Sequence, residues 1–256
     1  MSKALEVNGL SVSFGGLRAV DDLSFDVASG TVCGLIGPNG AGKTTVLNCL
    51  TRITQPSGGR VSALGVDILS LPIHSLIGLG VMRTFQNLEL FGELTTLDNV
   101  AMGCAHLFRT GYLSEIFGLP RARKARQHAY AQAEEVIDRL GLRDIRDQAV
   151  SELPFGTQKN VELARALCSK PKIMMMDEPA AGLNGIESAE LGKRIRTMAK
   201  EYGITVLLVE HDMPLVMSAC DKIVVVVQGK KVAEGTPEEV RRNPKVIEAY
   251  LGQEAR

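Results

Sequence analysis

Apolar and polar residues alternate along the first part of the chain, as in LSVSF at 10–14 and LSFDV at 23–27. A period of two is typical of β-strands that bury one face and expose the other, as strands of antiparallel sheets commonly do. The stretch SGGR at 57–60 predicts a turn, and residues 61–64 predict another short strand after it. The pattern therefore predicts an N-terminal antiparallel β subdomain.

Helical periodicity replaces this alternation between residues 90 and 155. One face of a predicted helix collects Ala129, Ala133, Val136, Ile137 and Leu140, and Gly141 follows as a helix stop. The basic run RARKAR at 121–126 precedes several acidic residues, so it fits either a solvated helix face or a nucleic-acid-binding patch. We predict an inserted α-helical subdomain at 90–159.

Helices and strands alternate after residue 160. The pattern predicts helices at 160–169, 186–202 and 213–219, and strands at 173–176, 205–209 and 223–227. These strands are continuous apolar runs, which indicates a parallel sheet covered by helices on both faces. The predicted fold class is α/β, as one domain over 1–256 with its core at 1–89 and 160–235 and a helical tail at 236–256.

The composition limits the kinds of partner and compartment. Lys plus Arg and Asp plus Glu both number 29 in 256 residues, so the zero formal net charge gives no global reason to bind a polyanion such as DNA. The five cysteines are scattered, odd in number and without a C-x-x-C pair, which indicates free thiols in a reducing cytosol. No run approaches the ~18 to 20 apolar residues of a membrane span, so we expect a chain that is soluble by itself.

A glycine-rich run lies between residues 32–36, which predict a buried strand, and 44–50, which predict a helix. It matches the phosphate-binding pattern G-x-x-x-x-G-K-[ST] and consists of Gly37, Pro38, Asn39, Gly40, Ala41, Gly42, Lys43 and Thr44. The glycines let N–H groups converge on an anion, and the helix directs the positive end of its dipole to the same point. Lys43 supplies a cation for the β- and γ-phosphates, and the Thr44 hydroxyl is placed to bind Mg²⁺.

Two predicted strands end in residues that can act on a bound nucleotide. Asp177 and Glu178 follow the strand at 173–176. Beside a phosphate loop, we expect the first carboxylate to hold Mg²⁺ and the second to polarise the attacking water. His211 follows the strand at 205–209 and can donate to the γ-phosphate. By itself such an acidic pair is more often a strand boundary, and a lone histidine is more often structural, so both roles depend on the phosphate loop.

The order of the motifs resembles the ATP-binding cassette (ABC) family over nearly the whole chain. The matching positions are Phe14, the loop at 37–44, Gln86, LPFGTQ at 153–158, DEP at 177–179, AGLN at 181–184, and His211. The resemblance implies a P-loop NTPase fold, namely an ABC-type nucleotide-binding domain with a RecA-like parallel-sheet core. It also implies ATP and Mg²⁺ as cofactors and ATP hydrolysis as the activity.

The resemblance assigns further roles residue by residue. Phe14 is expected to stack on adenine, and Thr45 to bind nucleotide together with the loop. Gln86 is expected to contact the metal, as do Thr44 and Asp177, and also the attacking water, as a catalytic residue beside Glu178 and His211.

Family members work as head-to-tail dimers in which the signature segment of one copy completes the site over the phosphate loop of the other. The resemblance therefore places Phe155 and Gly156 against the nucleotide of a second cassette. The chain departs from the usual L-S-G-G-Q signature, because Pro154 replaces the serine and Phe155 the first glycine, and Asn184 stands where aspartate is usual. Proline has no N–H to donate, so a weaker contact between the two copies is expected.

Within the family, the chain resembles the ATPase subunits of branched-chain amino acid uptake systems. The shared features are the aromatic-glycine signature, EPAAGLN at 178–184, the helical insert around 105–130, and the tail at 234–252. Urea, amide and lipopolysaccharide-export ATPases share much of that tail and remain alternatives. A soluble ABC-type ATPase that acts on nucleic acid is an alternative from another class, and a regulatory module without turnover is a third.

The resemblance implies a peripheral protein on the cytoplasmic face of the inner membrane. Its expected partners are a second ATPase subunit, either identical or paralogous, and transmembrane permease subunits; a solute-binding protein acts indirectly, and no nucleic acid is expected. We expect the permease to dock at residues 87–96, where Leu90 and Phe91 look exposed.

Overall fold

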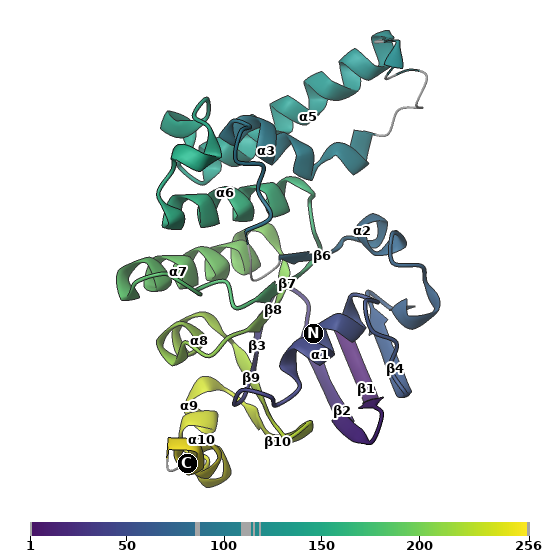
Figure 1. Cartoon of the computed structure of the whole chain (residues 1–256), viewed down its shortest axis with the longest axis vertical. Helices are drawn as coiled ribbons and strands as arrows, with labels where there is room; N and C mark the ends of the chain where they lie inside the picture. Colours follow the sequence, from purple (N-terminus) through teal and green to yellow (C-terminus); the bar gives the residue numbers. More distant parts are fainter. Residues whose placement is uncertain (1, 85–87, 109–113, 115, 118, 255–256) are drawn as a thin grey trace. The chain divides into compact units, whose positions relative to one another are not determined.

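The computed structural model describes residues 2–84, 88–108, 114, 116–117 and 119–254. Contacts divide the chain into two compact units (Figure 1). The first unit combines residues 1–86 with 172–256, and the second unit is formed by residues 87–171. The second unit includes the whole helix at Phe155–Cys168, whereas the predicted boundary at 159 assigned most of that helix to the core. The predicted domain boundaries stay a prediction.

The first unit contains a four-stranded sheet with the order β2-β1-β4-β5. Its strands are β1 (Lys3–Phe14), β2 (Leu17–Ala28), β4 (Gly58–Ala63) and β5 (Val66–Asp67), and all pairs are antiparallel. The predicted turn at 57–60 is wrong in part, because β4 already begins at Gly58. Gly59 has a φ of +98°, and a Cβ there would lie 2.5 Å from the Gly9 carbonyl oxygen, so glycine allows the close approach to β1.

A six-stranded sheet forms the rest of the core, with the order β10-β9-β3-β8-β7-β6. The strands are β3 (Val32–Ile36), β6 (Val81–Thr84), β7 (Ile173–Asp177), β8 (Thr205–Val209), β9 (Lys222–Val227) and β10 (Lys230–Gly235). All neighbours pair in parallel except β10, which is an antiparallel edge strand. The three consecutive methionines at 174–176 are buried in β7, as the apolar run predicted.

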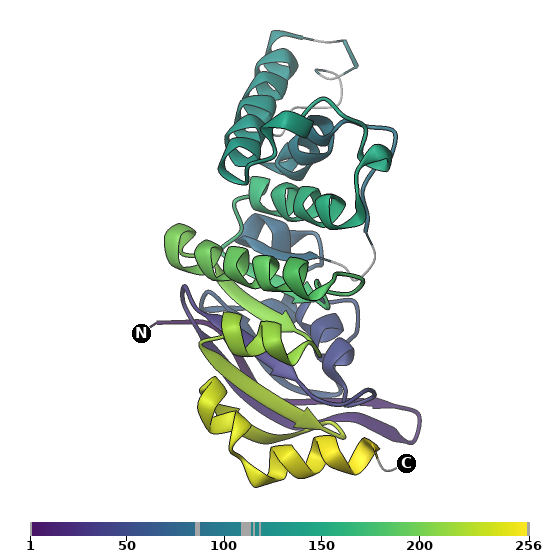
Figure 2. The same ribbon diagram turned by 90° about the vertical axis from the view of Figure 1, so that its left-hand side faces the viewer.

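Helices cover both faces of the six-stranded sheet (Figures 1 and 2). On one face lie α7 (Gly185–Tyr202) and α8 (Met213–Ala219), and on the other lies α1 (Lys43–Leu50). One hydrophobic cluster joins α1 and the four-stranded sheet to buried residues of β3, β7, β8 and β9. The first unit also contains α2 (Ser75–Leu79), α9 (Pro237–Arg241) and α10 (Pro244–Glu254).

The second unit is helical and has a hydrophobic cluster of its own. Its helices are α3 (Thr96–Gly103), α5 (Pro120–Arg139) and α6 (Phe155–Cys168). Ala129, Ala133 and Ile137 are buried along α5 as the periodicity predicted, and Gly141 follows with a φ of +69°. At Gly103 a Cβ would lie 2.0 Å from the Arg165 carbonyl oxygen, so α3 and α6 touch through their backbones.

Within the described ranges, no helix combines the length and the hydropathy needed to cross a bilayer. All five cysteines are free, as the sequence predicted, and all five are buried.

Candidate functional site

The phosphate loop connects β3 to α1, and its shape depends on glycine. Gly37, Gly40 and Gly42 have φ angles of +156°, +76° and +97°. A Cβ at Gly37 would lie 2.0 Å from the Val226 carbonyl oxygen, and a Cβ at Gly42 would lie 2.5 Å from the Ala19 carbonyl oxygen. The loop therefore passes β9 at Gly37 and the start of β2 at Gly42 with no room for a side chain at either glycine.

Lys43 is the first residue of α1, and its ammonium group lies against the loop. The side chain is buried, and Nζ donates to the carbonyl oxygens of Gly37 at 2.7 Å and Pro38 at 2.9 Å. Burial lowers the pKa of Lys43, and the negative charges of Glu178 and Asp177 oppose that shift. Thr44 and Thr45 follow in the first turn, exposed and half-buried respectively.

Asp177, the last residue of β7, is paired with a residue that the sequence did not single out. Its Oδ2 accepts from the Arg83 guanidinium at 2.7 Å, and the two side chains are only 6 % and 8 % exposed. Arg83 also donates to Asn48 at 2.8 Å and Thr51 at 3.2 Å. The sequence feature that could have pointed to Arg83 is a single basic residue in the short strand β6, three residues before Gln86.

The structure brings Glu178 and His211 together. The Glu178 backbone has a φ of +46°, and its N–H donates to the Val209 carbonyl oxygen at 2.9 Å, one residue beyond the β7 strand. Glu178 Oε1 lies 3.8 Å from His211 Nδ1. The His211 side chain is 61 % exposed and that of Glu178 22 %, so both remain accessible to a ligand above the strand ends.

Glu210 is a second residue that sequence reasoning missed. It is fully buried between β8 and His211, and its carboxylate accepts three backbone N–H bonds, from Ala180 at 2.8 Å, His211 at 2.9 Å and Asp212 at 3.2 Å. The sequence feature that could have pointed to Glu210 is its position between an apolar predicted strand and His211.

The remaining predicted site residues fall outside the described residues, in the hairpin of β1 and β2, or in the second unit. Gln86 falls among the residues that the structure leaves undescribed. Phe14 ends β1 and is 53 % exposed, in the hairpin whose second strand passes Gly42. Phe155 and Gly156 belong to the second unit, where the Phe155 ring is 46 % exposed and lies 5.7 Å from Lys159 Nζ.

The structure adds detail at two further places that the sequence singled out, the predicted docking segment and Asn184. Leu90 is only partly exposed and packs on the core of the second unit, whereas Phe91 is 51 % exposed as expected. Asn184 is the N-cap of α7, where its side chain accepts from the N–H groups of Ile186 and Glu187 and forms a capping box with the Glu187 carboxylate.

Comparison with known families matches two segments of the chain. Residues 20–181 match the family described as ABC transporter. Residues 230–256 match the family described as branched-chain amino acid ATP-binding cassette transporter.

Curated relatives match nearly the full length. The chain is 44 % identical to the high-affinity branched-chain amino acid transport ATP-binding protein BraF of Pseudomonas aeruginosa, over 97 % of this chain and 98 % of BraF. It is 43 % identical to LivG of Escherichia coli, which carries the same description, with the same coverage. The lipopolysaccharide export system ATP-binding protein LptB of Acidithiobacillus ferridurans is 32 % identical, over 99 % of each chain.

Solved structures agree in fold. The ADP conformation of MJ1267, an ATP-binding cassette of an ABC transporter, superposes with a TM-score of 0.85 at 31 % identity, over 98 % of this chain and 100 % of that chain. A nucleotide-free cassette from an ABC transporter gives a TM-score of 0.84 at 30 % identity, over 97 % of this chain and 99 % of that one. The P-loop NTPase fold, ATP binding and the ATPase class expected from the resemblance are thereby confirmed, and the chain belongs to the ABC transporter family as an ATP-binding cassette.

Proposed function

We propose that this ATPase drives an importer for branched-chain amino acids. The observation that carries the proposal is the graded similarity to curated relatives. Identity is 43–44 % to the branched-chain amino acid transport proteins and 32 % to the lipopolysaccharide-export ATPase, over nearly the same length. The match at 230–256 supports the same solute class, because the matched family is described as branched-chain amino acid ATP-binding cassette transporter.

The phosphate loop holds the β- and γ-phosphates of ATP in this proposal. The loop at 37–42 offers its N–H groups, and Lys43 exchanges the carbonyl oxygens of Gly37 and Pro38 for phosphate oxygens. Thr45 adds a hydroxyl in the same helical turn. Phe14, exposed at the end of β1, stacks on the adenine.

The donor set beside the loop fits Mg²⁺. Thr44 offers a hydroxyl and Asp177 a carboxylate, which are hard oxygen ligands of the kind Mg²⁺ prefers. The amide of Gln86, which lies outside the described residues, is the third ligand that the sequence predicts. Among the residues described, no three His, Cys, Asp or Glu side chains gather as a metal site. That arrangement suits an ion which takes most of its ligands from phosphates and water. When bound, Mg²⁺ neutralises the charge that develops on the β- and γ-phosphates.

Hydrolysis depends on the residues that follow β7 and β8. Glu178 accepts a hydrogen bond from the attacking water and directs it at the γ-phosphate, in line with the leaving oxygen. His211, 3.8 Å away, donates to the γ-phosphate and senses its presence. Gln86 is proposed to contact the metal and the water.

A second cassette completes the site in this proposal. The N-terminus of α6, which begins with Phe155 and Gly156, faces the nucleotide bound by the partner copy and offers its N–H groups to the γ-phosphate. Closure of the two copies on ATP is the step that does work on the membrane subunits.

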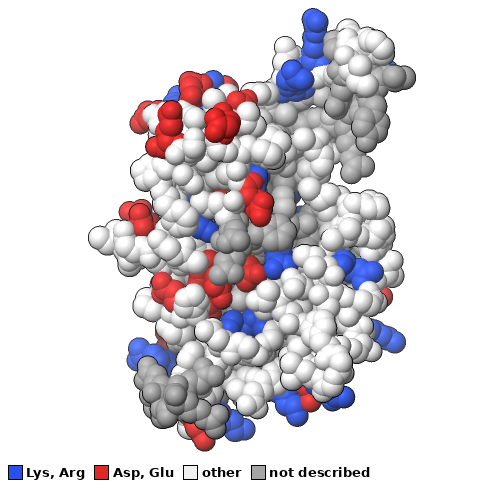
Figure 3. Space-filling model, in the orientation of Figure 1, with Lys and Arg blue, Asp and Glu red and all other residues white. Residues whose placement is uncertain are grey.

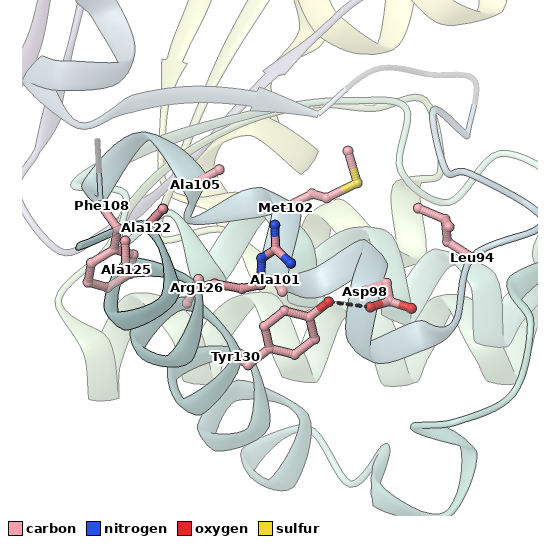
Figure 4. Close-up of a pocket in the computed structure, with 11 residues that line it drawn as sticks. Leu94, Asp98, Ala101, Met102, Ala105, Phe108, Ala122, Ala125, Arg126 and Tyr130 are labelled. Carbon is pink, nitrogen blue, oxygen red and sulfur yellow. Dashed lines mark hydrogen bonds between the residues drawn. The ribbon is translucent and has the colours of Figure 1, made fainter. Parts of the chain in front are cut away.

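The second unit offers a surface for the membrane subunits. A pocket of about 460 Å³ lies between α3 and α5, lined by Leu94, Met102, Phe108, Arg126 and Tyr130 among others (Figure 4). The Tyr130 hydroxyl donates to Asp98 at 2.6 Å on its floor. Phe91, Leu94 and Met102 are 51 %, 37 % and 46 % exposed. We propose that residues 88–96 and this pocket receive a cytoplasmic helix of the permease, which places the cassette on the cytoplasmic face of the membrane.

The nucleic-acid alternative finds less support. Among the described residues on the face drawn in Figure 3, acidic and basic side chains both occur and no continuous basic surface is visible. Proteins that bind nucleic acid without base recognition need such a surface to neutralise phosphates.

The test of the proposed function is solute-stimulated ATP hydrolysis by the assembled transporter. The cassette would be co-purified with its native permease subunits, reconstituted in vesicles, and supplied with the cognate binding protein and leucine, isoleucine or valine. Stimulation by these amino acids and not by urea or short amides supports the proposal. Stimulation by urea, an amide or lipopolysaccharide alone, or purification without any membrane protein, contradicts it.

A further inference from the structure

One buried carboxylate connects the loops that carry Glu178 and His211. Glu210 Oε1 accepts from the N–H of Ala180 at 2.8 Å, and Oε2 accepts from those of His211 at 2.9 Å and Asp212 at 3.2 Å. Ala180 lies in the loop after β7, whereas His211 and Asp212 lie in the loop after β8. A single side chain, fully buried, therefore bonds to both loops.

The turn that carries Glu178 is held on each side. The Glu178 N–H donates to the Val209 carbonyl oxygen at 2.9 Å, and the Ala181 N–H donates back to the Glu178 carbonyl oxygen at 3.0 Å. Glu178 takes a left-handed conformation, with a φ of +46°, which residues other than glycine adopt only when their surroundings enforce it. The hydrogen bond from the Ala180 N–H to Glu210 is a contact between the turn that carries Glu178 and the loop that carries His211.

A second contact ties the His211 loop to the residues that follow. Asp212 Oδ2 accepts from the Ser188 hydroxyl of α7 at 2.7 Å, while its Oδ1 accepts from the Leu215 N–H and caps α8. The segment from Glu178 to Ser188 and the loop at 210–212 are thus joined at two points, by the side chains that flank His211.

We propose that Glu210 is a positioning residue for hydrolysis, which holds the Glu178 carboxylate and the His211 imidazole at a fixed separation so that both reach the same γ-phosphate. This inference rests on the proposed function. Glu178 Oε1 and His211 Nδ1 lie 3.8 Å apart, beyond a hydrogen bond, and Glu210 joins the backbones that carry the two side chains. Glu210 itself is buried beneath them and touches backbone N–H groups.

The chemistry requires a carboxylate of this length. Both of its oxygens accept from N–H donors, and a carboxylate has no donor of its own to place against them. In Glu210→Gln an NH₂ group replaces one oxygen, so it faces an N–H and the bond to one of the two loops is lost. In Glu210→Asp the charge stays, but the side chain is one methylene shorter and cannot span both loops.

The test compares turnover with nucleotide binding in the full chain. For Glu210→Gln we expect kcat for ATP hydrolysis to fall about tenfold to a hundredfold. ADP affinity, measured by calorimetry, is expected to stay unchanged because the phosphate loop is untouched. Glu210→Asp is expected to lie between wild type and Glu210→Gln. The matched control is Glu162→Gln, the same change at a buried glutamate of α6 that lies in the other unit, for which we expect wild-type kcat.

The outcomes separate this inference from the proposed function. Wild-type kcat in both Glu210 variants overturns the inference, and so does a parallel loss of kcat and ADP affinity, which is the mark of general unfolding. If Glu210→Gln does not fold, Glu210→Asp with a reduced kcat and unchanged ADP affinity supports it. Glu178→Gln is assayed alongside: full activity in that variant contradicts the role given to Glu178, whereas loss of activity there with normal Glu210 variants contradicts only the role of Glu210.

Discussion

The ion pair between Arg83 and Asp177 places two charges in the interior beside the nucleotide site. Its atoms lie 2.7 Å apart, and the same guanidinium donates to Asn48 of α1 and to Thr51 at the end of that helix. One side chain thereby joins β6, β7 and α1. Removing one partner of a buried pair leaves the other charge without compensation, which is more costly than losing an exposed pair.

We expect Arg83→Leu to lower the free energy of unfolding by about 3 to 5 kcal/mol, because Asp177 would remain buried without its partner. Urea denaturation followed by circular dichroism measures the change. The control is Lys3→Ala, which removes an exposed pair with Glu6 in the same unit and should cost less than about 1 kcal/mol. Equal losses in the two variants would show that the buried pair contributes no more to stability than the exposed pair.

Glu178→Gln is expected to reduce kcat by about a hundredfold or more while ATP still binds, because an amide cannot accept the proton of the attacking water. Lys43→Ala is the contrasting variant: it removes the cation from the phosphate loop and should weaken ATP binding itself. Phosphate release measures the first defect and titration with ATP the second. Undiminished steady-state hydrolysis by Glu178→Gln would exclude it as the base.

At the scale of single residues, the sequence indicated the candidate site residues but not the residues that hold them in place. Lys43, Asp177, Glu178 and His211 stand in local patterns, each at the start of a helix or the end of a strand. Their supporting contacts are not local. Arg83 and Asp177 are 94 positions apart, and the Glu210 bond to Ala180 spans 30. A local pattern does not specify which distant side chain will meet it.

The bounds of strands and helices could be predicted from the sequence where an element is buried along its whole length. β7, β8 and β9 are apolar runs with a polar residue at one end only, because both faces of the sheet are covered, and their bounds agree with the predicted strands to within one residue. The start of β4 was missed because its two glycines look like a turn, whereas Gly59 serves the close approach to Gly9. α6 begins at Phe155, five residues before the predicted start at 160, because the signature segment itself forms its first turn.

Helix α6 carries a titratable group that makes stability depend on pH. Burial raises the pKa of Glu162 from 4.5 to about 7, against the attraction of Lys159 and Arg165. A carboxyl group with a raised pKa binds more protons folded than unfolded between those values, so it stabilises the fold at low pH and loses that effect as pH rises towards 7. We expect the stability of wild type relative to Glu162→Gln to fall over this window, as measured by denaturation at several pH values. A constant difference would contradict the raised pKa.

At the scale of the whole molecule, the second unit supplies the N-terminus of α6, which in the proposed dimer contacts the nucleotide of the other cassette. α6 has Pro154 as its N-cap, with a φ of −57° and a ψ of 148°, and no side chain caps the helix. Serine adopts that conformation readily, and as an N-cap it contributes about 0.5 to 2 kcal/mol relative to residues that cannot cap. The same residue faces the second cassette in the proposed dimer.

We therefore expect Pro154→Ser to strengthen ATP-dependent dimerisation when introduced together with Glu178→Gln, which prevents turnover. Serine restores an N–H and a hydroxyl, both able to donate to the γ-phosphate bound by the partner copy. Light scattering with and without ATP measures the dimer fraction. Pro154→Ala restores the N–H alone and should lie between. If neither variant increases the dimer fraction, the proposed contact between the signature segment and the partner's nucleotide is contradicted.

The buried thiols have a practical consequence for such experiments. All five cysteines are free and enclosed, and burial raises the pKa of Cys33 to about 12 and of Cys49 to about 11. Maleimide reagents attack accessible thiolates, so the native protein offers them little to react with. A single cysteine introduced on the exposed Phe155 or Phe91 can then carry a spin label or fluorophore without deleting any natural thiol. The natural cysteines would therefore stay unlabelled, as distance measurements between two labelled cassettes require.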